Sequence, residues 1–356
     1  MKYILIISPA LSKGGMERQL SILLYNFDRS KFCITLALLR NKIEYDIPND
    51  IEVINLNKNG KIDLLFYLKF FKLLQDKKWD IIHSKISGLN EQVMFFCGIL
   101  NKKNLIVEIR SSGERLYKNY KQMNFLFKLF KKIDKWNVIT NSKKAKDELI
   151  QFIKKQNKIK IVFNAINTTK FKKINLKNNS DKFIIGFIGR IQSVKNIEIL
   201  IKTLNILNNK NIFLKIYGNI DDINYYNSLI DLIIKYNLKN NIILSKAVNN
   251  IEKIYNKFDL FILPSHHEGT PNVLLEAMSC ECLCLVSEGA NSDDYLDNEF
   301  VFNNSDYNIL ADKINMMISL TKDKQKDIKI NNRDYIVNNF SIDKMVEKYE
   351  KIWIKI

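Results

Sequence analysis

The stretch from Leu260 to Met278, LFILPSHHEGTPNVLLEAM, carries the clearest information about the fold. It begins with a short apolar strand, Leu260 to Leu263, passes through a polar loop and continues as a helix. We expect Thr270 to cap this helix and Pro271 to occupy its first position. A buried strand that leads through a loop into a helix is the repeating unit of a parallel α/β sheet.

The same unit recurs on both sides of this stretch. Apolar runs without polar alternation are typical of parallel strands that are buried on both faces. The runs in the first half of the chain are 3–7, 34–39, 81–83, 105–109 and 137–140. Those in the second half are 183–188, 213–217, 242–244, 260–263 and 282–286. The sequence therefore predicts an α/β protein with two Rossmann-like, doubly wound domains that face a central cleft.

The chain length agrees with two domains, since 356 residues exceed one ordinary core. A polar stretch rich in Asn and Lys, residues 168–181, separates the two series of strands. We expect an N-terminal domain over 1–170 and a C-terminal domain over 171–340. Residues 341–356 have apolar side chains at helical spacing, which predicts an amphipathic helix that closes back toward the first domain.

The net charge is +18, from 56 Lys and Arg against 38 Asp and Glu. This excess favours an anionic partner, which is a nucleic acid, a phosphorylated substrate or an acidic membrane face. No run reaches the 18 or so apolar residues of a membrane span, and the N-terminal residues do not resemble a signal peptide. Five cysteines, three of them alternating in one apolar run, argue against a disulfide framework. We therefore expect a cytoplasmic protein, soluble or peripheral to the membrane.

Residues 117–136 combine six lysines with a larger number of apolar and aromatic side chains. This composition fits a basic helix that lies on the anionic inner face of the cytoplasmic membrane. It fits equally a core helix with a lysine-rich outer side.

Three motifs follow predicted strands. The first contains Gly14, Gly15 and Glu17 after strand 3–7, where glycines at a helix start let backbone amides approach a phosphate. The alternative is a tight turn, with Glu17 as a favourable acid in the first helical turn. The second contains Arg190 and Lys195 after strand 183–188, a pair of cations that could hold a diphosphate from one loop. The alternative for Lys195 is a solvated charge.

The third motif lies in the opening stretch. Helix capping by Thr270 predicts that the amides of Asn272, Val273 and Leu274 are free to bind an anion. Two carboxylates, Glu268 and Glu276, flank this position and could accept hydrogen bonds from sugar hydroxyls. An unpaired carboxylate buried in an apolar helix is costly, which favours a ligand for Glu276.

Together these motifs resemble the retaining, nucleotide-sugar-dependent glycosyltransferases of family four, which have the GT-B fold. The resemblance is carried by the E-x7-E pair within EGTPNVLLEAM, the upstream G-R-x4-K-N and the N-terminal G-G-M-E-R, in order along nearly the whole chain. It implies that Arg190 and Lys195 bind the donor diphosphate, Glu276 the ribose, and Glu268 the transferred sugar. It also implies that Gly15 lies near the phosphate or the acceptor. By the same resemblance, domain 1–170 would bind the acceptor and domain 171–340 the nucleotide sugar.

The chain departs from that family where relatives carry a histidine after the fourth strand, because it has Arg110 there. Arg110 is thus a candidate for contact with an anionic acceptor, together with Gly14, Glu17 and His83. His83 ends a predicted strand and fits a cleft or core histidine better than a general base.

The resemblance implies a hexosyltransferase that moves a sugar from a nucleoside diphosphate donor, UDP-linked, to a hydroxyl of a growing surface glycan. The acceptor would belong to lipopolysaccharide, capsule or a lipid-linked oligosaccharide. We expect neither a metal nor another cofactor, since cations and a helix start would neutralise the leaving diphosphate and no Asp-x-Asp pair is placed at the cleft. We expect no nucleic-acid partner. The alternatives are a sugar-nucleotide epimerase or phosphorylase on the same fold, and a basic surface-binding protein without catalysis.

Overall fold

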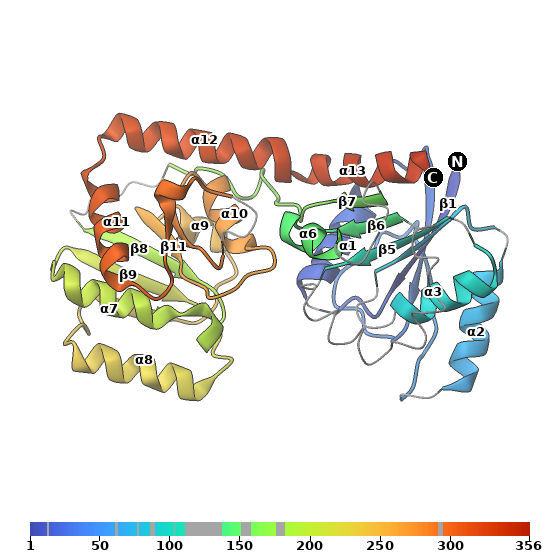
Figure 1. The fold of residues 1–356 in the computed structure, drawn as a ribbon, viewed down its shortest axis with the longest axis horizontal. Helices are drawn as coiled ribbons and strands as arrows, with labels where there is room; N and C mark the ends of the chain where they lie inside the picture. Colours follow the sequence, from blue (N-terminus) through green and yellow to red (C-terminus); the bar gives the residue numbers. More distant parts are fainter. Residues whose placement is uncertain are drawn as a thin grey trace. The chain divides into compact units, whose positions relative to one another are not determined.

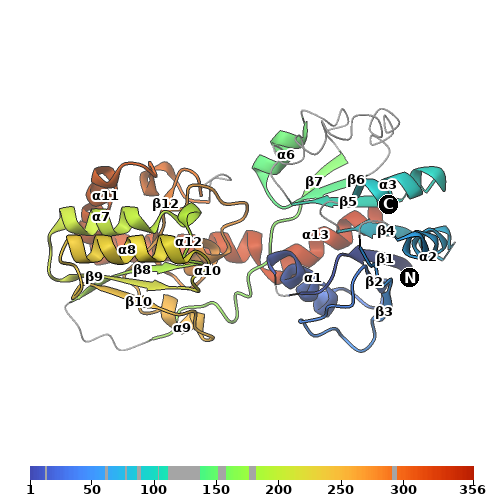
Figure 2. The ribbon, with the colours of Figure 1, turned by 90° about the horizontal axis from the view of Figure 1, so that it is seen from below.

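The computed structural model describes residues 1–12, 14–60, 63–76, 78–85, 90–102, 104–110, 137–150, 158–175, 182–290 and 295–356. The chain divides into two compact units. Unit 1 comprises Met1–Ala165 together with Ile342–Ile356, and unit 2 comprises Ile166–Ser341. Each unit is built on its own parallel sheet with helices packed on it (Figures 1 and 2).

Among the described residues, the sheet of unit 1 has seven parallel strands in the order β3-β2-β1-β4-β5-β6-β7. The strands are β1 Lys2–Ser8, β2 Phe32–Leu38, β3 Glu52–Asn55, β4 Ile81–Ser84, β5 Leu105–Ile109, β6 Asn137–Thr140 and β7 Ile159–Ile161. The helices are α1 Gly15–Asn26, α2 Leu64–Gln75, α3 Asn90–Ile99, α6 Lys143–Ile150 and α13 Ile342–Lys355. The direction of winding changes between β1 and β4, which is where open α/β sheets bind their ligands.

Side chains of β1 alternate between two cores on opposite faces of this sheet. Ile4 and Ile6 pack with α1 and α13, whereas Leu5 and Ile7 pack with α2 and α3. This alternation explains why residues 4–7 of β1 are all apolar, since neither face of the strand is left to water there.

The described part of unit 2 contains a six-stranded parallel sheet in the order β10-β9-β8-β11-β12-β13. The strands are β8 Phe183–Ile188, β9 Ile212–Tyr217, β10 Ile242–Ser245, β11 Leu260–Leu263, β12 Leu283–Ser287 and β13 Val301–Phe302. The helices are α7 Ile197–Leu207, α8 Ile223–Lys235, α9 Ile251–Tyr255, α10 Asn272–Ser279, α11 Tyr307–Ser319 and α12 Lys322–Phe340, with 3-10 turns η3 Ser193–Lys195 and η4 Asn298–Phe300. Here the winding changes between β8 and β11.

The prediction of two doubly wound α/β domains is confirmed. Three strands were not foreseen, and all three lie at sheet edges, namely β3, β7 and β13. Each is only two to four residues long. An edge strand is buried less completely than a central one, so it lacks the long apolar run by which the central strands were recognised.

The chain crosses from unit 1 to unit 2 at residues 165–166 and returns at 341–342. The two crossings are hydrogen-bonded to each other, because the Ile166 amide donates to the Phe340 carbonyl at 2.7 Å and Ile166 forms an isolated bridge with Ser341. The amphipathic helix expected after residue 341 is α13, whose apolar side chains Met345, Tyr349 and Trp353 are buried in unit 1. Of the helices that the structure describes, none has both the length and the apolar character needed to cross a membrane.

Candidate functional site

The change of winding in unit 2 brings together two of the predicted motifs, the loop after β8 and the loop after β11. The His266 amide donates to the Val194 carbonyl at 2.9 Å, and the Asn196 side-chain amide donates to the Pro264 carbonyl at 3.2 Å. The two loops therefore form one structure, which positions Lys195 opposite Glu268.

Lys195 and Glu268 form an ion pair, with Lys195 Nζ at 2.5 Å from Glu268 Oε1. Their side chains are 13% and 14% exposed, so the pair is largely but not fully removed from water. The Ser265 hydroxyl donates to the same carboxylate oxygen at 2.8 Å. The solvated-charge interpretation of Lys195 is thus wrong, because the ammonium is held beside a carboxylate at the loop junction.

Asn196 anchors this loop. It is the last residue of the G-R-x4-K-N motif and was not predicted as a site residue. Its backbone is left-handed, with φ of 51°, a conformation that asparagine tolerates better than most residues. Its buried side chain donates to the carbonyls of Pro264 and Asn304, the second at 2.6 Å. Asn196 therefore fixes the position of Lys195 relative to β11.

Gly289 allows the loop after β12 to close against the β11 loop. A Cβ atom at this glycine would lie 2.0 Å from the His266 carbonyl oxygen, so no side chain fits without moving the backbone. The Glu268 amide donates to the Gly289 carbonyl at 3.2 Å, and the Ser287 hydroxyl donates to the Ser265 carbonyl at 2.5 Å. These bonds hold the loop that carries Glu268 against the end of β12.

Arg190 lies on the same loop as Lys195 but has a different partner. Its guanidinium pairs with Asp221 at 3.1 Å, and 65% of the side chain is exposed. The two cations of the predicted clamp are therefore each balanced by their own carboxylate, and Arg190 remains accessible to an anion from solvent.

The start of α10 differs from the sequence prediction. The helix begins at Asn272, and Pro271 is the N-cap because its ψ of 72° lies outside the helical range. Thr270 therefore precedes the N-cap instead of occupying it. The Asn272 amide donates to the Thr270 carbonyl and the Leu274 amide to the Pro271 carbonyl, both at 2.9 Å, so these two amides are not free. Among the described residues, only the Val273 amide of this trio has no acceptor.

Glu276 is buried in α10, with 4% of the residue exposed. The Tyr255 hydroxyl donates to Glu276 Oε2 at 3.1 Å. Burial, and next the Glu276 charge, raise the pKa of Tyr255 well above its usual range, so the phenol stays protonated and acts as the donor. Tyr255 lies 21 residues before Glu276 on another helix, and no local pattern in the sequence links them.

In unit 1, the first motif forms the start of α1. Gly14 is the N-cap in an extended conformation and Gly15 is the first helical residue. The Glu17 side chain folds back over Gly14, where a Cβ atom would lie 2.3 Å from Glu17 Oε2. A carboxylate in this position stabilises the helix start, which agrees with the first-turn interpretation of Glu17. Lys13, in the same motif, lies outside the described residues.

The two remaining acceptor candidates, His83 and Arg110, lie at the carboxyl ends of β4 and β5 and share Glu108 as a partner. His83 has no exposed surface, and its Nε2 lies 3.2 Å from Glu108 Oε2. It therefore offers no surface to an acceptor in this structure and is a core histidine. The side chain of Arg110 is 11% exposed. Its guanidinium pairs with Glu108 and donates to Asn164 Oδ1 at 2.8 Å.

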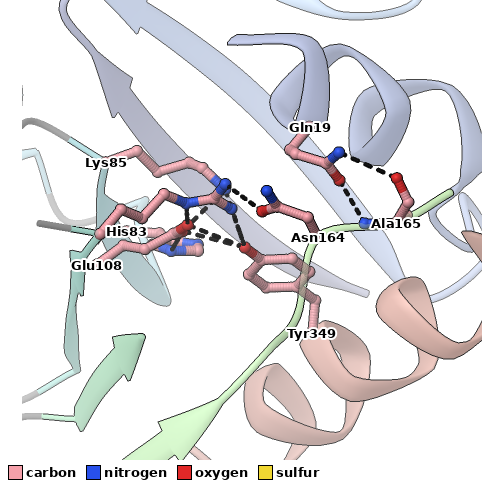
Figure 3. A network of polar contacts seen from close by, with 8 residues as sticks. Gln19, His83, Lys85, Glu108, Asn164, Ala165 and Tyr349 are labelled. Carbon is pink, nitrogen blue, oxygen red and sulfur yellow. Dashed lines mark hydrogen bonds and ion pairs between the residues drawn. The ribbon is translucent and has the colours of Figure 1, made fainter. Parts of the chain in front are cut away.

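Three further residues complete this network, namely Lys85, Glu108 and Tyr349. None of them was predicted from the sequence as a site residue. Lys85 Nζ lies 2.8 Å from Glu108 Oε2 and 3.1 Å from the Tyr349 hydroxyl, and its side chain has no exposed surface. The Tyr349 hydroxyl donates to Glu108 at 3.1 Å and accepts a hydrogen bond from Lys85 (Figure 3). It also accepts a hydrogen bond from Arg110. All hydrogen-bonding positions of this hydroxyl are therefore used. A charged residue inside the apolar run LIVEI was the available signal for Glu108.

The network has two cations and one carboxylate, and burial affects each group differently. Burial would raise the pKa of the Glu108 carboxyl, but the charges of Arg110 and Lys85 outweigh it and hold that pKa well below its usual range. Burial lowers the pKa of His83 despite its hydrogen bond to Glu108. The cluster therefore contains a neutral imidazole and an excess of positive charge at neutral pH.

This arrangement predicts that unit 1 loses stability in mild acid. Folded His83 stays neutral while the unfolded histidine binds a proton, so its contribution is complete above about pH 6.5 and decreases below it, by at most about 1.4 kcal/mol per pH unit. All three tryptophans lie in unit 1, so tryptophan fluorescence during urea unfolding reports on this unit alone.

The urea concentration at the unfolding midpoint should decrease as the pH is lowered from about 7.5 to about 5.5, the range in which an unfolded histidine takes up its proton. The other two histidines, His266 and His267, lie in unit 2, so His267→Gln is a matched control that should leave the shift unchanged. A midpoint independent of pH over this range would show that folded His83 binds a proton as readily as the unfolded residue does.

Several sequence interpretations concern other parts of the chain. In the part that the structure describes, no group of three or more His, Cys, Asp or Glu side chains is placed to hold a metal ion. Cys280, Cys282 and Cys284 are buried, and burial raises the pKa of Cys282 to about 12. They pack as protonated thiols. The basic segment 117–136 lies outside the described residues, as do Ser111–Gly113 and residues 291–294.

Comparison with known proteins agrees with this geometry. Residues 167–335 match the family model described as "Glycosyl transferases group 1". The capsular polysaccharide biosynthesis glycosyltransferase CapM of Staphylococcus aureus is 28% identical over 313 residues, which cover 82% of this chain and 80% of CapM. The Campylobacter jejuni protein named N-acetylgalactosamine-N,N'-diacetylbacillosaminyl-diphospho-undecaprenol 4-alpha-N-acetylgalactosaminyltransferase is 28% identical over 315 residues, which cover 82% of each chain.

Among solved structures, the Anabaena protein HepE in complex with UDP has a TM-score of 0.82 at 17% identity, over 100% of both chains. This similarity establishes the GT-B fold. The chain thus has the GT-B fold, its residues 167–335 match the glycosyltransferase group 1 model, and these matches support a glycosyltransferase.

Proposed function

We propose that this protein is a retaining hexosyltransferase that moves a sugar from a UDP-linked donor to a hydroxyl of a lipid-linked or growing surface glycan. The observation that carries the proposal is the Lys195–Glu268 ion pair at the winding change of unit 2, inside the glycosyltransferase group 1 domain. The named relatives add the substrate class, since one is a capsule glycosyltransferase and another transfers a sugar to a diphospho-undecaprenol glycan.

In this proposal the chain itself neutralises the diphosphate that leaves the donor. Lys195 would share its ammonium between Glu268 and a phosphate oxygen, and the exposed guanidinium of Arg190 would turn from Asp221 to a second oxygen. The Val273 amide at the start of α10 would donate to the same group. Stabilising charge as it develops on the leaving oxygen is the main electrostatic contribution to such a reaction, and it needs no metal.

The two glutamates take different parts. Glu268, close to Lys195, would accept hydrogen bonds from the transferred sugar, whereas Glu276, oriented by Tyr255, would accept from the ribose hydroxyls. A retaining transfer would occur on the face of the sugar from which the diphosphate leaves, with a phosphate oxygen accepting the proton of the attacking hydroxyl. In unit 1, Arg110 would contact an anionic acceptor from within its network.

The proposal is tested by incubating the protein with a panel of nucleotide sugars and measuring released nucleoside diphosphate, with and without a lipid-linked glycan acceptor. We expect release that depends on the acceptor, and a product whose anomeric configuration, measured by NMR, is that of the donor. Donor consumption without acceptor would indicate an epimerase or phosphorylase. Strongly salt-dependent duplex binding without nucleotide-sugar affinity would indicate a non-catalytic basic protein.

The roles of the two glutamates are separable by calorimetry with UDP. Glu276→Gln is expected to weaken UDP binding by roughly tenfold, since a carboxylate accepts two hydroxyl protons where an amide offers one acceptor oxygen. Glu268→Gln should lower turnover while changing UDP affinity less. Glu299→Gln, the same change at an exposed carboxylate of unit 2, is the control. A larger loss of UDP affinity in Glu268→Gln than in Glu276→Gln would reverse the two assignments.

A further inference from the structure

The outer side of α2 carries the most exposed group of large apolar side chains in unit 1. Leu64, Leu65 and Leu68 are 75%, 62% and 69% exposed. The opposite side of the same helix buries Phe66, Phe70 and Leu74 in the core, so α2 is apolar on both sides. A surface helix of a soluble domain normally turns polar residues to water, and an apolar cluster of this kind marks an interaction surface.

The helix itself is firmly formed, so this exposure is a property of folded unit 1. Asp63 caps α2 by accepting a hydrogen bond from the Phe66 amide at 2.9 Å. Figures 1 and 2 both show α2 beside α3 at the outside of unit 1. Phe96 of α3 contacts the rings of Phe70 and Phe71, and Ile99 at the end of α3 is 59% exposed. The apolar exposure therefore continues on the neighbouring helix.

Within α2 itself both charges are positive, and the carboxylate beside them is that of Asp63, which caps the helix. Lys69 and Lys72 are the only charged residues within α2, and both are exposed. Lys58 lies beside the same helix, with its ammonium 5.5 Å from the centre of the Phe66 ring. A second copy of this chain would place lysines against lysines, which opposes self-association through this face. Leucines flanked by lysines are complementary to a surface that is apolar inside and anionic outside.

We propose that this α2 face, formed by Leu64, Leu65 and Leu68 with Lys69 and Lys72, docks on an anionic lipid bilayer. The leucines enter the boundary between headgroups and acyl chains, and the lysines contact lipid phosphates. This surface brings unit 1 to the membrane where a lipid-linked acceptor would be found. The inference rests on α2 alone and not on the proposed catalysis, so the two can fail independently.

The test is co-sedimentation of the whole protein with vesicles of phosphatidylcholine, alone or mixed with phosphatidylglycerol. Wild type should bind the anionic vesicles more strongly, and high salt should weaken this binding. Leu64→Ser/Leu65→Ser/Leu68→Ser should reduce the partition coefficient by about tenfold or more, because the inserted apolar area is lost. Lys69→Glu/Lys72→Glu should reduce it by at least roughly 25-fold, from about fivefold for each cation removed near the surface, with further repulsion from the two new carboxylates.

The matched control is Ile223→Ser/Ile234→Ser, which removes two exposed apolar side chains from α8 of unit 2, 58% and 52% exposed. This variant should bind vesicles as wild type does. Circular dichroism should show all variants folded, since only exposed side chains change. Wild-type binding that neither α2 variant reduces would overturn the proposal and assign membrane contact to another segment. A wild-type dimer that the leucine variant converts to a monomer would identify a second copy as the occupant instead.

Discussion

Replacing Lys195 by alanine is expected to lower turnover by about thirty-fold to a thousand-fold, which corresponds to roughly 2 to 4 kcal/mol of lost transition-state stabilisation. The reason is the position of the ammonium. It is held beside Glu268 by a loop that Asn196 and the His266 amide fix in place, so it needs no rearrangement when charge develops on a leaving diphosphate. A cation that is fixed in advance contributes more than one that must first be ordered.

The measurement is steady-state release of nucleoside diphosphate at saturating donor. Lys210→Ala, which removes an exposed lysine from the same unit, should retain wild-type turnover. Arg190→Ala should have a smaller effect than Lys195→Ala, because its guanidinium is 65% exposed and screened by water. Turnover of Lys195→Ala within a few-fold of wild type would mean that the diphosphate is neutralised by other groups.

Replacing Glu108 by glutamine is expected to lower the free energy of unfolding of unit 1 by about 3 to 5 kcal/mol. The substitution keeps the shape of the side chain but removes the one carboxylate that balances Lys85 and Arg110, of which Lys85 has no exposed surface. Such a loss is a large part of the stability of an ordinary domain.

Urea unfolding followed by tryptophan fluorescence measures this loss, because all three tryptophans lie in unit 1. A double variant, Glu108→Gln/Lys85→Met, should recover part of the stability, since the most buried unpaired cation is then absent. Equal midpoints of wild type and Glu108→Gln would show that the network contributes no net stability. A double variant less stable than Glu108→Gln would show that Lys85 stabilises unit 1 by means other than its pairing with Glu108.

The central strands and the loops that follow them could be predicted from the sequence, because both depend on local patterns. An apolar run such as 183–188 identifies β8, and ligand-binding residues of parallel sheets follow the strand ends, so Lys195 and Glu268 could be expected near each other. The incomplete burial of β3, none of whose residues is fully buried, and the short length of β13 left no such pattern.

The network of unit 1 could not be predicted, since it depends on register and on distant segments. Lys85 lies opposite Glu108 because Ser84 pairs with Val107 in the parallel β4–β5 ladder, and a sequence does not display that register. Tyr349, which hydrogen-bonds to Glu108, lies 241 residues further along the chain. Its place on the apolar side of α13 could be predicted from spacing, but its polar partners could not.

The double crossing of the chain has a consequence for synthesis on the ribosome. Unit 2 is one continuous stretch, whereas the core of unit 1 requires Met345, Val346 and Trp353 of α13, which follow all of unit 2. At about 5 to 20 residues per second, those side chains emerge roughly ten to forty seconds after residue 165. During this interval the face of β1 that α13 covers, with Ile4 and Ile6, lacks its partner. We therefore expect unit 2, although it is made later, to be able to fold before the core of unit 1 is complete.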